Sequence, residues 1–190
     1  MRKCDAINSI VLAIKNSFSN NLNERIRNGY INYERQLQAE LFHHLKLELA
    51  PDIDIWFEQV LNLKTTGGPI FTPDIILSLN DMIIAVIELK YLIFGNPTFK
   101  KDIKKFHRLN GYSKEKRVLF DTLVFDKENE DLIWHHRFNI YDKFLSVFIV
   151  FGEKECAAFK LKDITKPPNF FHVCGYYSNN SQLKIDFKLS

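Results

Sequence analysis

Apolar residues at helical spacing occur in two segments near the start of the chain. The first segment predicts a helix over residues 5–20, with a connection where Asn and Ser gather at residues 16–23. The second predicts a helix from Tyr33 to about Leu49, capped by Asn32 and ended before Pro51. The two apolar stripes are Ile7, Ile10, Val11 and Ile14 in the first segment, and Tyr33, Leu37, Leu41 and Leu45 in the second.

Over residues 53–91, the pattern changes to the alternation of apolar and polar residues that is typical of strands. Residues 53–63 predict one strand, and the Thr-Thr-Gly-Gly-Pro run at 65–69 predicts a loop. Residues 73–79 and 82–91 predict a hairpin that turns about Asn80 and Asp81. This part of the chain therefore supplies three successive strands.

An amphipathic helix is predicted at residues 98–110, with Gly111 as its expected end and Phe99, Ile103, Phe106 and Leu109 on its inner side. Residues 118–125 then predict a strand, and residues 132–141 a strand or a short helix. Residues 144–151 and 156–161 predict two more strands. Alternation at residues 183–187 predicts an edge strand in the tail.

The order of these elements indicates an α/β (mixed α+β) fold, in which a central mixed sheet is flanked by helices. With 190 residues and 46% apolar residues, the chain suits one domain with a full hydrophobic core. We expect a single domain over residues 1–190, with a core at about 31–162. The helix at 5–20 would precede this core, and residues 163–190 would form a C-terminal extension.

The cysteines and the apolar runs indicate a cytoplasmic protein. Cys4, Cys156 and Cys174 are scattered and form no CxxC pair, which argues against a zinc ribbon and favours a reducing compartment. No apolar run is long enough to span a bilayer, so we expect no membrane partner.

Charged residues occur where the predicted hairpin strands should be apolar. Alternation places Glu88 and Lys90 on one face of their strand, with Ile84 and Val86 further back on the same face. Counting outward from the turn places Asp74 level with Glu88. Two neighbouring carboxylates repel each other unless a cation lies between them, and oxygen ligands with open coordination positions suit Mg²⁺ or Mn²⁺. The pattern predicts metal-dependent hydrolysis of a phosphodiester; the alternative is a charged hairpin end that faces water.

Two short motifs, Pro73-Asp74 and Glu88-Leu89-Lys90, resemble those of the PD-(D/E)XK nuclease superfamily, which has the restriction-endonuclease-like fold. That core is a helix, three antiparallel strands, a second helix and a further strand, which is similar to the predicted order over residues 31–151. The resemblance implies that Asp74 and Glu88 bind the metal, with the Leu89 backbone carbonyl as a candidate third ligand. It also implies that Lys90 is the catalytic base or orients the attacking water.

Many members of the superfamily add a glutamate from the first helix to the catalytic site as a further metal ligand, and Glu34 and Glu40 are the candidates here. Measured from Tyr33, the apolar stripe centres near about 60°, Glu34 lies at about 100° and Glu40 at about 340°, so Glu34 is nearer the buried face. The sequence YERQLQAELFHHL is also similar to the E-R-x-L start of archaeal Holliday-junction resolvases, which again favours Glu34. Gln38, one turn further on, could support Glu34, and Glu58 is a third candidate.

Basic residues gather just after the hairpin. Eight Lys or Arg residues occur between positions 98 and 117, including Lys100, Lys101, Lys104, Lys105 and Arg108, although the net charge of the whole chain is only +3. Such a stripe beside a metal site suits a phosphate backbone; the alternative is the solvated outer face of a helix.

Together, these features predict a Mg²⁺- or Mn²⁺-dependent deoxyribonuclease, a hydrolase that is either an endonuclease or an exonuclease. DNA is expected in preference to RNA, with specificity supplied by a homodimer or a protein partner. The alternative is a catalytically silent or partner-dependent nucleic-acid-binding subunit of a defence or mobile-element complex.

Overall fold

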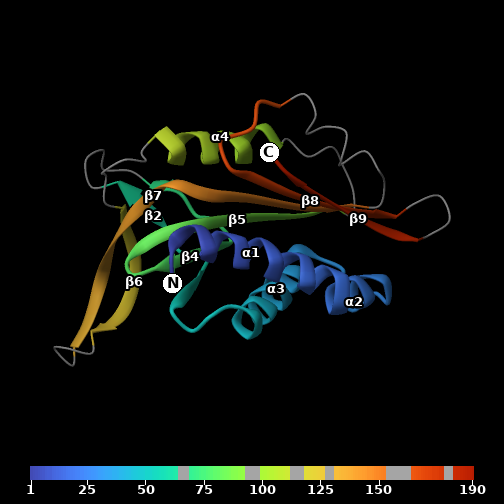
Figure 1. Ribbon diagram of the computed structural model, residues 1–190, viewed down its shortest axis with the longest axis horizontal. Helices are drawn as coiled ribbons and strands as arrows, with labels where there is room; N and C mark the ends of the chain where they lie inside the picture. Colours follow the sequence, from blue (N-terminus) through green and yellow to red (C-terminus); the bar gives the residue numbers. More distant parts are fainter. Residues whose placement is uncertain (64–68, 93–98, 112–117, 127–130, 153–163, 178–181) are drawn as a thin grey trace.

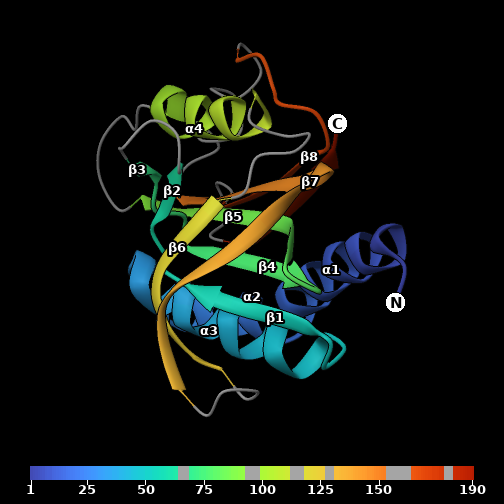
Figure 2. The same ribbon diagram turned by 90° about the vertical axis from the view of Figure 1, so that its left-hand side faces the viewer.

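The computed structural model describes residues 1–63, 69–92, 99–111, 118–126, 131–152, 164–177 and 182–190. In this part of the chain, a mixed β-sheet lies between two helical layers (Figures 1 and 2). Helices α1 (Lys3–Ser17), α2 (Asn23–Arg27) and α3 (Glu34–Glu48) lie on one face, and α4 (Phe99–Gly111) lies on the other. The predicted mixed α+β class, with helices on both sides of a central sheet, is confirmed. None of the described helices combines the length and apolar character needed to cross a membrane.

The N-terminal helical layer is more continuous than the sequence predicts. α1 runs directly into a π-helical turn, η1 (Phe18–Leu22), and then into α2. The predicted connection at residues 16–23 is therefore wrong. Phe18 and Leu22 are fully buried, and their packing keeps a segment rich in Asn and Ser helical.

The predicted second helix is confirmed as α3, with Leu37, Leu41 and Leu45 fully buried. Its N-terminus differs from the prediction, because Tyr33 occupies the N-cap position and its side chain is exposed. Asn32 does not cap the helix; instead, its backbone N–H donates to Oε1 of Gln36 at 3.0 Å. The first turn is thus closed by a side chain from inside the helix.

The predicted hairpin is confirmed as β4 (Ile75–Leu79) and β5 (Met82–Leu92). Asn80 and Asp81 have φ angles of 49° and 56°, the left-handed geometry of a two-residue turn that matches the twist of the strands. Asn and Asp tolerate this conformation better than most residues do.

The side chain of Ile84 in β5 points to the opposite face of the sheet from the one predicted. The pairing of β4 with β5 shifts so that Leu77 is opposite Ala85 and Ser78 is opposite Ile83, which leaves Ile84 in a β-bulge. Ile84 therefore packs with α1 and α3, whereas Val86 packs with α4.

The long strand β7 (Asp131–Gly152) joins the two parts of the sheet. Its second half pairs in parallel with β5 and β8 (Phe170–Tyr177), and its first half pairs antiparallel with β6 (Val118–Asp126). The six-strand mixed sheet has the order β1 (Ile53–Phe57), β4, β5, β7, β8 and β9 (Leu183–Leu189). From β7, a second branch continues through β6 and β2 (Leu61–Leu63) to β3 (Pro69–Phe71).

Several strand predictions need correction. The single strand expected at residues 53–63 is broken into β1 and β2, because Glu58 between them has a φ of 48°. The separate segments expected at 132–141 and 144–151 are one strand, β7, and β8 was not predicted at all. The tail strand is confirmed as β9, an edge strand that pairs with β8. The strand predicted at 156–161 lies outside the described residues.

Each face of the sheet packs against its own helices. Leu37, Leu41 and Leu45 of α3 pack with Ile87 and Leu89 of β5 on one face. On the other face, the predicted inner side of α4 is confirmed by four buried residues, Phe99, Ile103, Phe106 and Leu109. Residues 86 to 90 of β5 therefore lie between two packed layers, where a charged side chain is unusual.

Gly175 of β8 leaves space for the Phe151 ring. A Cβ added at Gly175 would lie 2.0 Å from Cε1 of Phe151, which is stacked on Phe18 with ring centroids 5.2 Å apart. We expect Gly175→Ala to lower the free energy of unfolding by about 1–3 kcal/mol, since the ring must move within a close-packed core.

Gly111→Ala is the matched control, because no atom of the described residues lies within 4 Å of its added Cβ. Urea unfolding followed by circular dichroism measures both variants. A Gly175→Ala protein as stable as the Gly111→Ala protein would contradict the packing described here.

Candidate active site

Asp74 lies at the open end of the hairpin, one residue before β4. Its Oδ2 accepts a hydrogen bond from the backbone N–H of Leu89 at 2.6 Å, which ties the start of β4 to the end of β5. The pairing of Ile75 with Ile87 places Asp74 level with Glu88, as the count from the turn predicted. The two carboxylates therefore lie side by side, where β4 begins and where β5 still continues to Leu92.

The backbone of Asp74 is held from two other directions. Its carbonyl accepts hydrogen bonds from the Glu58 N–H at 3.0 Å and from Nε2 of Gln38 at 3.3 Å. Gln38 comes from α3 and is 1% exposed. The position of Asp74 is therefore fixed by the sheet and by the helix beneath it.

Glu88 is a carboxylate in the middle of the packed sheet, and it is only 4% exposed. Its Oε1 lies 3.0 Å from Nζ of Lys105 and 3.4 Å from Nζ of Lys90. Its Oε2 has no hydrogen-bond partner among the residues that the structure describes. A buried carboxylate oxygen without a partner is costly, so this oxygen is a strong candidate for a ligand contact.

Alternating charges connect the two helical layers through Glu88. Glu34 of α3 lies 3.5 Å from Lys90, and Asp102 of α4 lies 3.0 Å from Lys105. Because both lysines also contact Glu88, the order across the site is acid, base, acid, base, acid. We call this row, Glu34–Lys90–Glu88–Lys105–Asp102, the charge ladder.

Burial raises the pKa of both central carboxyl groups. Burial raises the pKa of Glu88 to about 7, and the Asp74 charge adds to the effect, while Lys90 and Lys105 oppose it. Burial likewise raises the pKa of Asp74 to about 6, against the hydrogen bond from Leu89. Burial lowers the pKa of Lys90, but the Glu88 and Glu34 carboxylates outweigh burial and raise it above its ordinary value. Lys90 is therefore protonated at neutral pH.

The structure separates the three glutamates that were candidates to complete the site. Glu34 reaches it, because its Oε2 accepts from the Tyr91 N–H at 3.3 Å and its Oε1 contacts Lys90. Glu40 points elsewhere and forms an ion pair with Arg25 at 2.6 Å. Glu58 lies beside Asp74 through its backbone. Gln38 does not support Glu34, since it contacts Asp74 and Glu58 instead.

The predicted nucleic-acid-binding residues lie on α4, and they divide into two groups. Lys100, Lys101, Lys104 and Arg108 are exposed. Lys105 is half-buried and turns toward Glu88. The outer group is available to a large polyanion, whereas Lys105 belongs to the site itself.

From the sequence, Lys105 was predicted only as a nucleic-acid-binding residue of the basic surface, and Asp102 was not predicted as a site residue. A signal was present, because on a helical wheel both residues border Leu109 at the edge of the buried stripe, whereas Lys100 and Lys104 lie across from it. A charged pair at spacing i, i+3 at that border is placed to reach the sheet.

The donors suit a hard divalent cation that keeps most of its own waters. In the part of the chain that the structure describes, no three His, Cys, Asp or Glu side chains gather closely enough to enclose a metal ion. Mg²⁺ does not need such a cage, since it commonly binds one or two carboxylates and takes its other ligands from water and phosphate. The partnerless Oε2 of Glu88 and the neighbouring Asp74 carboxylate fit that requirement.

No family model matches this chain, and no curated protein matches it. The function of the site is therefore inferred from its geometry and from the chemistry of its residues.

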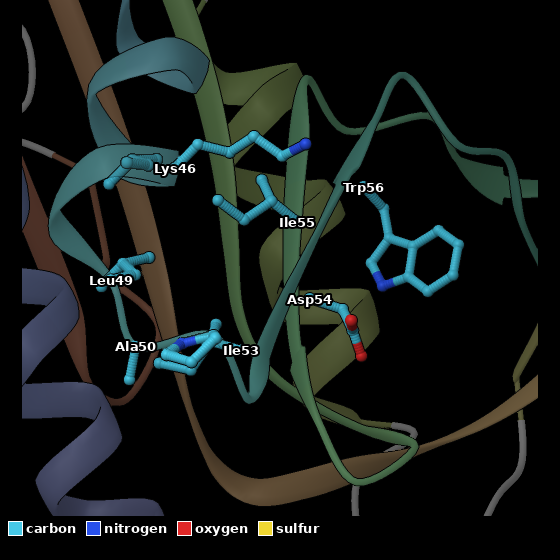
Figure 3. Close-up of a pocket in the computed structure, with 9 residues that line it drawn as sticks. Lys46, Leu49, Ala50, Ile53, Asp54, Ile55 and Trp56 are labelled. Atoms are coloured by element: carbon cyan, nitrogen blue, oxygen red, sulfur yellow. The ribbon is translucent and has the colours of Figure 1, made fainter.

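A pocket of about 300 Å³ lies away from this site (Figure 3). It is formed by the C-terminal end of α3 and by β1, with Leu45, Lys46, Leu49, Ala50, Pro51, Ile53, Asp54, Ile55 and Trp56 as its lining. Glu34 begins α3, so the pocket is at the opposite end of that helix. It contains neither Asp74 nor any residue of the charge ladder, whereas the two carboxyl groups with a raised pKa, Asp74 and Glu88, lie together at the hairpin, so we take the hairpin as the candidate site.

The raised pKa of Glu88 predicts a pH-dependent stability in the metal-free protein. The unfolded carboxyl ionises near its ordinary pKa of 4.5, and the folded one near 7. The free energy of unfolding should therefore fall as pH rises from about 4.5 to 7, because the folded state binds the proton more tightly.

Glu88→Gln removes this group, so its stability relative to wild type should increase across the same window. Urea unfolding in EDTA at several pH values from about 4 to 8 measures the difference, in which contributions common to both proteins cancel. A difference that does not change with pH would contradict a buried Glu88 with a raised pKa.

Proposed function

We propose that this chain is a Mg²⁺- or Mn²⁺-dependent nuclease of the PD-(D/E)XK type, acting on DNA. The observation that carries the proposal is the pair of carboxylates, half-buried Asp74 and buried Glu88, level with each other on the hairpin with Lys90 beside Glu88. Buried charges are weak evidence for stability, whereas carboxylates that can hold a divalent cation beside a lysine suit metal-dependent phosphodiester hydrolysis.

The order of the elements supports the same proposal. Apart from the inserted strands β2 and β3 after β1 and β6 after α4, the chain runs from α3 through β1, β4 and β5, which are antiparallel neighbours, then through α4 to β7, whose second half is parallel to β5. This is the order of helix, three antiparallel strands, helix and strand expected of a restriction-endonuclease-like core. The candidate residues lie at the start of the second of these strands and near the end of the third.

Each residue has a role that follows from its position. Asp74 and Glu88 would hold the metal ion, which supplies Lewis-acid activation of water and neutralises charge on the phosphate. The Leu89 carbonyl is retained as the candidate third ligand, while its N–H orients Asp74. The Glu34 carboxylate holds Lys90 from the far side.

Lys90 acts as a hydrogen-bond donor in this mechanism. A lysine is already protonated at neutral pH at its ordinary pKa of 10.5, and the neighbouring carboxylates, Glu88 foremost, raise the pKa of Lys90 further against burial, so it is poorly suited to accept a proton from water. It can instead orient the attacking water and stabilise the negative charge that develops on the phosphate oxygens. Of the two roles that the family resemblance implies, water orientation is the better supported.

A second function is favoured by one observation, the occupation of Glu88 by two ammonium groups. Lysines that neutralise the carboxylate permanently would leave a nucleic-acid-binding subunit without catalysis. Such a subunit would use the exposed Lys100, Lys101, Lys104 and Arg108 of α4 to bind phosphates.

A cleavage assay on labelled nucleic acids distinguishes these functions. With Mg²⁺ or Mn²⁺, wild type should cut at least one of five substrates: supercoiled plasmid, linear duplex, single-stranded DNA, branched DNA or RNA. Asp74→Asn and Lys90→Met should each lower the rate by about 10²- to 10⁴-fold, since each removes a group that acts on the reacting phosphate or water.

Glu40→Gln is the matched control, because Glu40 pairs with Arg25 away from the site, and it should cut at the wild-type rate. Cutting that survives in Asp74→Asn would contradict the assignment. Binding without cutting by wild type on all five substrates would favour the silent subunit.

A further inference from the structure

Lys105 differs from the other basic residues of α4 in what it contacts. Its Nζ lies 3.0 Å from Oε1 of Glu88 and 3.0 Å from Oδ1 of Asp102. Its charge therefore neutralises a buried carboxylate, whereas the charges of Lys100 and Lys104 face solvent. Of the two ammonium groups on Glu88, that of Lys105 is the closer, by 3.0 Å against 3.4 Å.

The charged groups around Glu88 carry a net negative charge that one divalent cation would balance. Among the residues that the structure describes, the carboxylates of Glu34, Asp74, Glu88 and Asp102 face the two ammonium groups of Lys90 and Lys105. When all of these groups are ionised, two negative charges remain, which one divalent ion would balance. The partnerless Oε2 of Glu88 is the oxygen that such an ion would reach first.

A metal ion and Lys105 compete for the same carboxylate. An ion bound to Glu88 would lie about 2.1 Å from its oxygen, so an ammonium group 3.0 Å from the same carboxylate would repel it strongly. Lys105 can move away from Glu88 and still keep one ion pair, because it already contacts Asp102, one helical turn before it.

We propose that Lys105 is the resident counter-ion of Glu88, and that a divalent metal displaces it toward Asp102. The displaced ammonium then lies between the metal site and the exposed basic face of α4, where it contacts the phosphate of the bound strand. The second step rests on the proposed nuclease function, whereas the first concerns metal binding alone. In the free protein, Lys105 is a positioning residue that keeps Glu88 in place.

Mn²⁺ binding to the full chain without nucleic acid tests the displacement. Electron paramagnetic resonance of free Mn²⁺ gives the dissociation constant for wild type and three variants. Lys105→Gln should bind Mn²⁺ about threefold to tenfold more tightly than wild type, because the competing cation is gone. Lys105→Arg keeps the charge and should restore the wild-type affinity to within about twofold.

Lys104→Gln is the matched control for charge. It removes one positive charge from the neighbouring position of α4 but leaves the contact with Glu88 intact, so its affinity should stay within about twofold of wild type. Circular dichroism and thermal unfolding check that each variant is folded. A merely structural role for Lys105 predicts weaker Mn²⁺ binding in Lys105→Gln, since the site would loosen.

The outcomes separate the two proposals. Unchanged or weaker Mn²⁺ binding by folded Lys105→Gln overturns the displacement, even if wild type cuts DNA. Tighter binding by Lys105→Gln, in a wild type that cuts no substrate, supports the displacement and removes the nuclease function. No Mn²⁺ binding by wild type or by any variant overturns both.

Discussion

The buried carboxylate of Glu88 is the constraint around which this end of the molecule is organised. It lies in a strand with packed layers on both faces, and burial strongly disfavours an isolated negative charge there. Lys90 from the same strand and Lys105 from α4 supply positive charge at 3.4 and 3.0 Å. Burying this charge lowers the stability of the fold, and Oε2 of Glu88 still lacks a partner in the described part of the chain. We therefore infer that Glu88 serves to bind a ligand and not to stabilise the fold.

The charge ladder also explains why helices from both layers belong to the site. α3 brings Glu34 to Lys90 from one side, and α4 brings Asp102 to Lys105 from the other. Figure 2 shows that these helices lie on opposite faces of the sheet. Apolar packing against the sheet fixes both helices, through Leu37 and Leu41 on α3 and through Phe99 and Phe106 on α4. The hydrophobic core therefore sets the geometry of the charged groups.

The local sequence pattern was enough to predict the hairpin and the placement of its two carboxylates side by side. Alternation in β5, together with the Asn-Asp turn, is sufficient to place Asp74 level with Glu88. The helical stripe of α4 was equally clear, because its four inner residues follow a strict helical period. The angles of Glu34 and Glu40 around their helix favoured Glu34 as the site residue. In the structure, Glu34 contacts Lys90 of the hairpin, whereas Glu40 pairs with Arg25.

Features that depend on distant contacts could not be predicted in this way. The bulge at Ile84 and the helical continuation through Phe18 depend on packing against other elements. β8 lies between its parallel neighbour β7 and the edge strand β9, and it is buried along almost its whole length, so it lacks the alternation that marks a half-exposed strand. Lys105 was predicted only to bind nucleic acid; its position at the border of the buried stripe of α4 indicates that it faces the sheet, but its particular partner, Glu88, lies on another element and could not be predicted from the helix alone.

The most direct measurement is a crystal structure of the protein soaked with Mn²⁺, with anomalous scattering used to locate the metal. We expect a single strong peak within coordination distance of both Asp74 and Glu88, with Lys105 moved away from Glu88. A peak elsewhere, or no peak at saturating Mn²⁺ while Lys105 stays on Glu88, would contradict the claim that these carboxylates form a metal site.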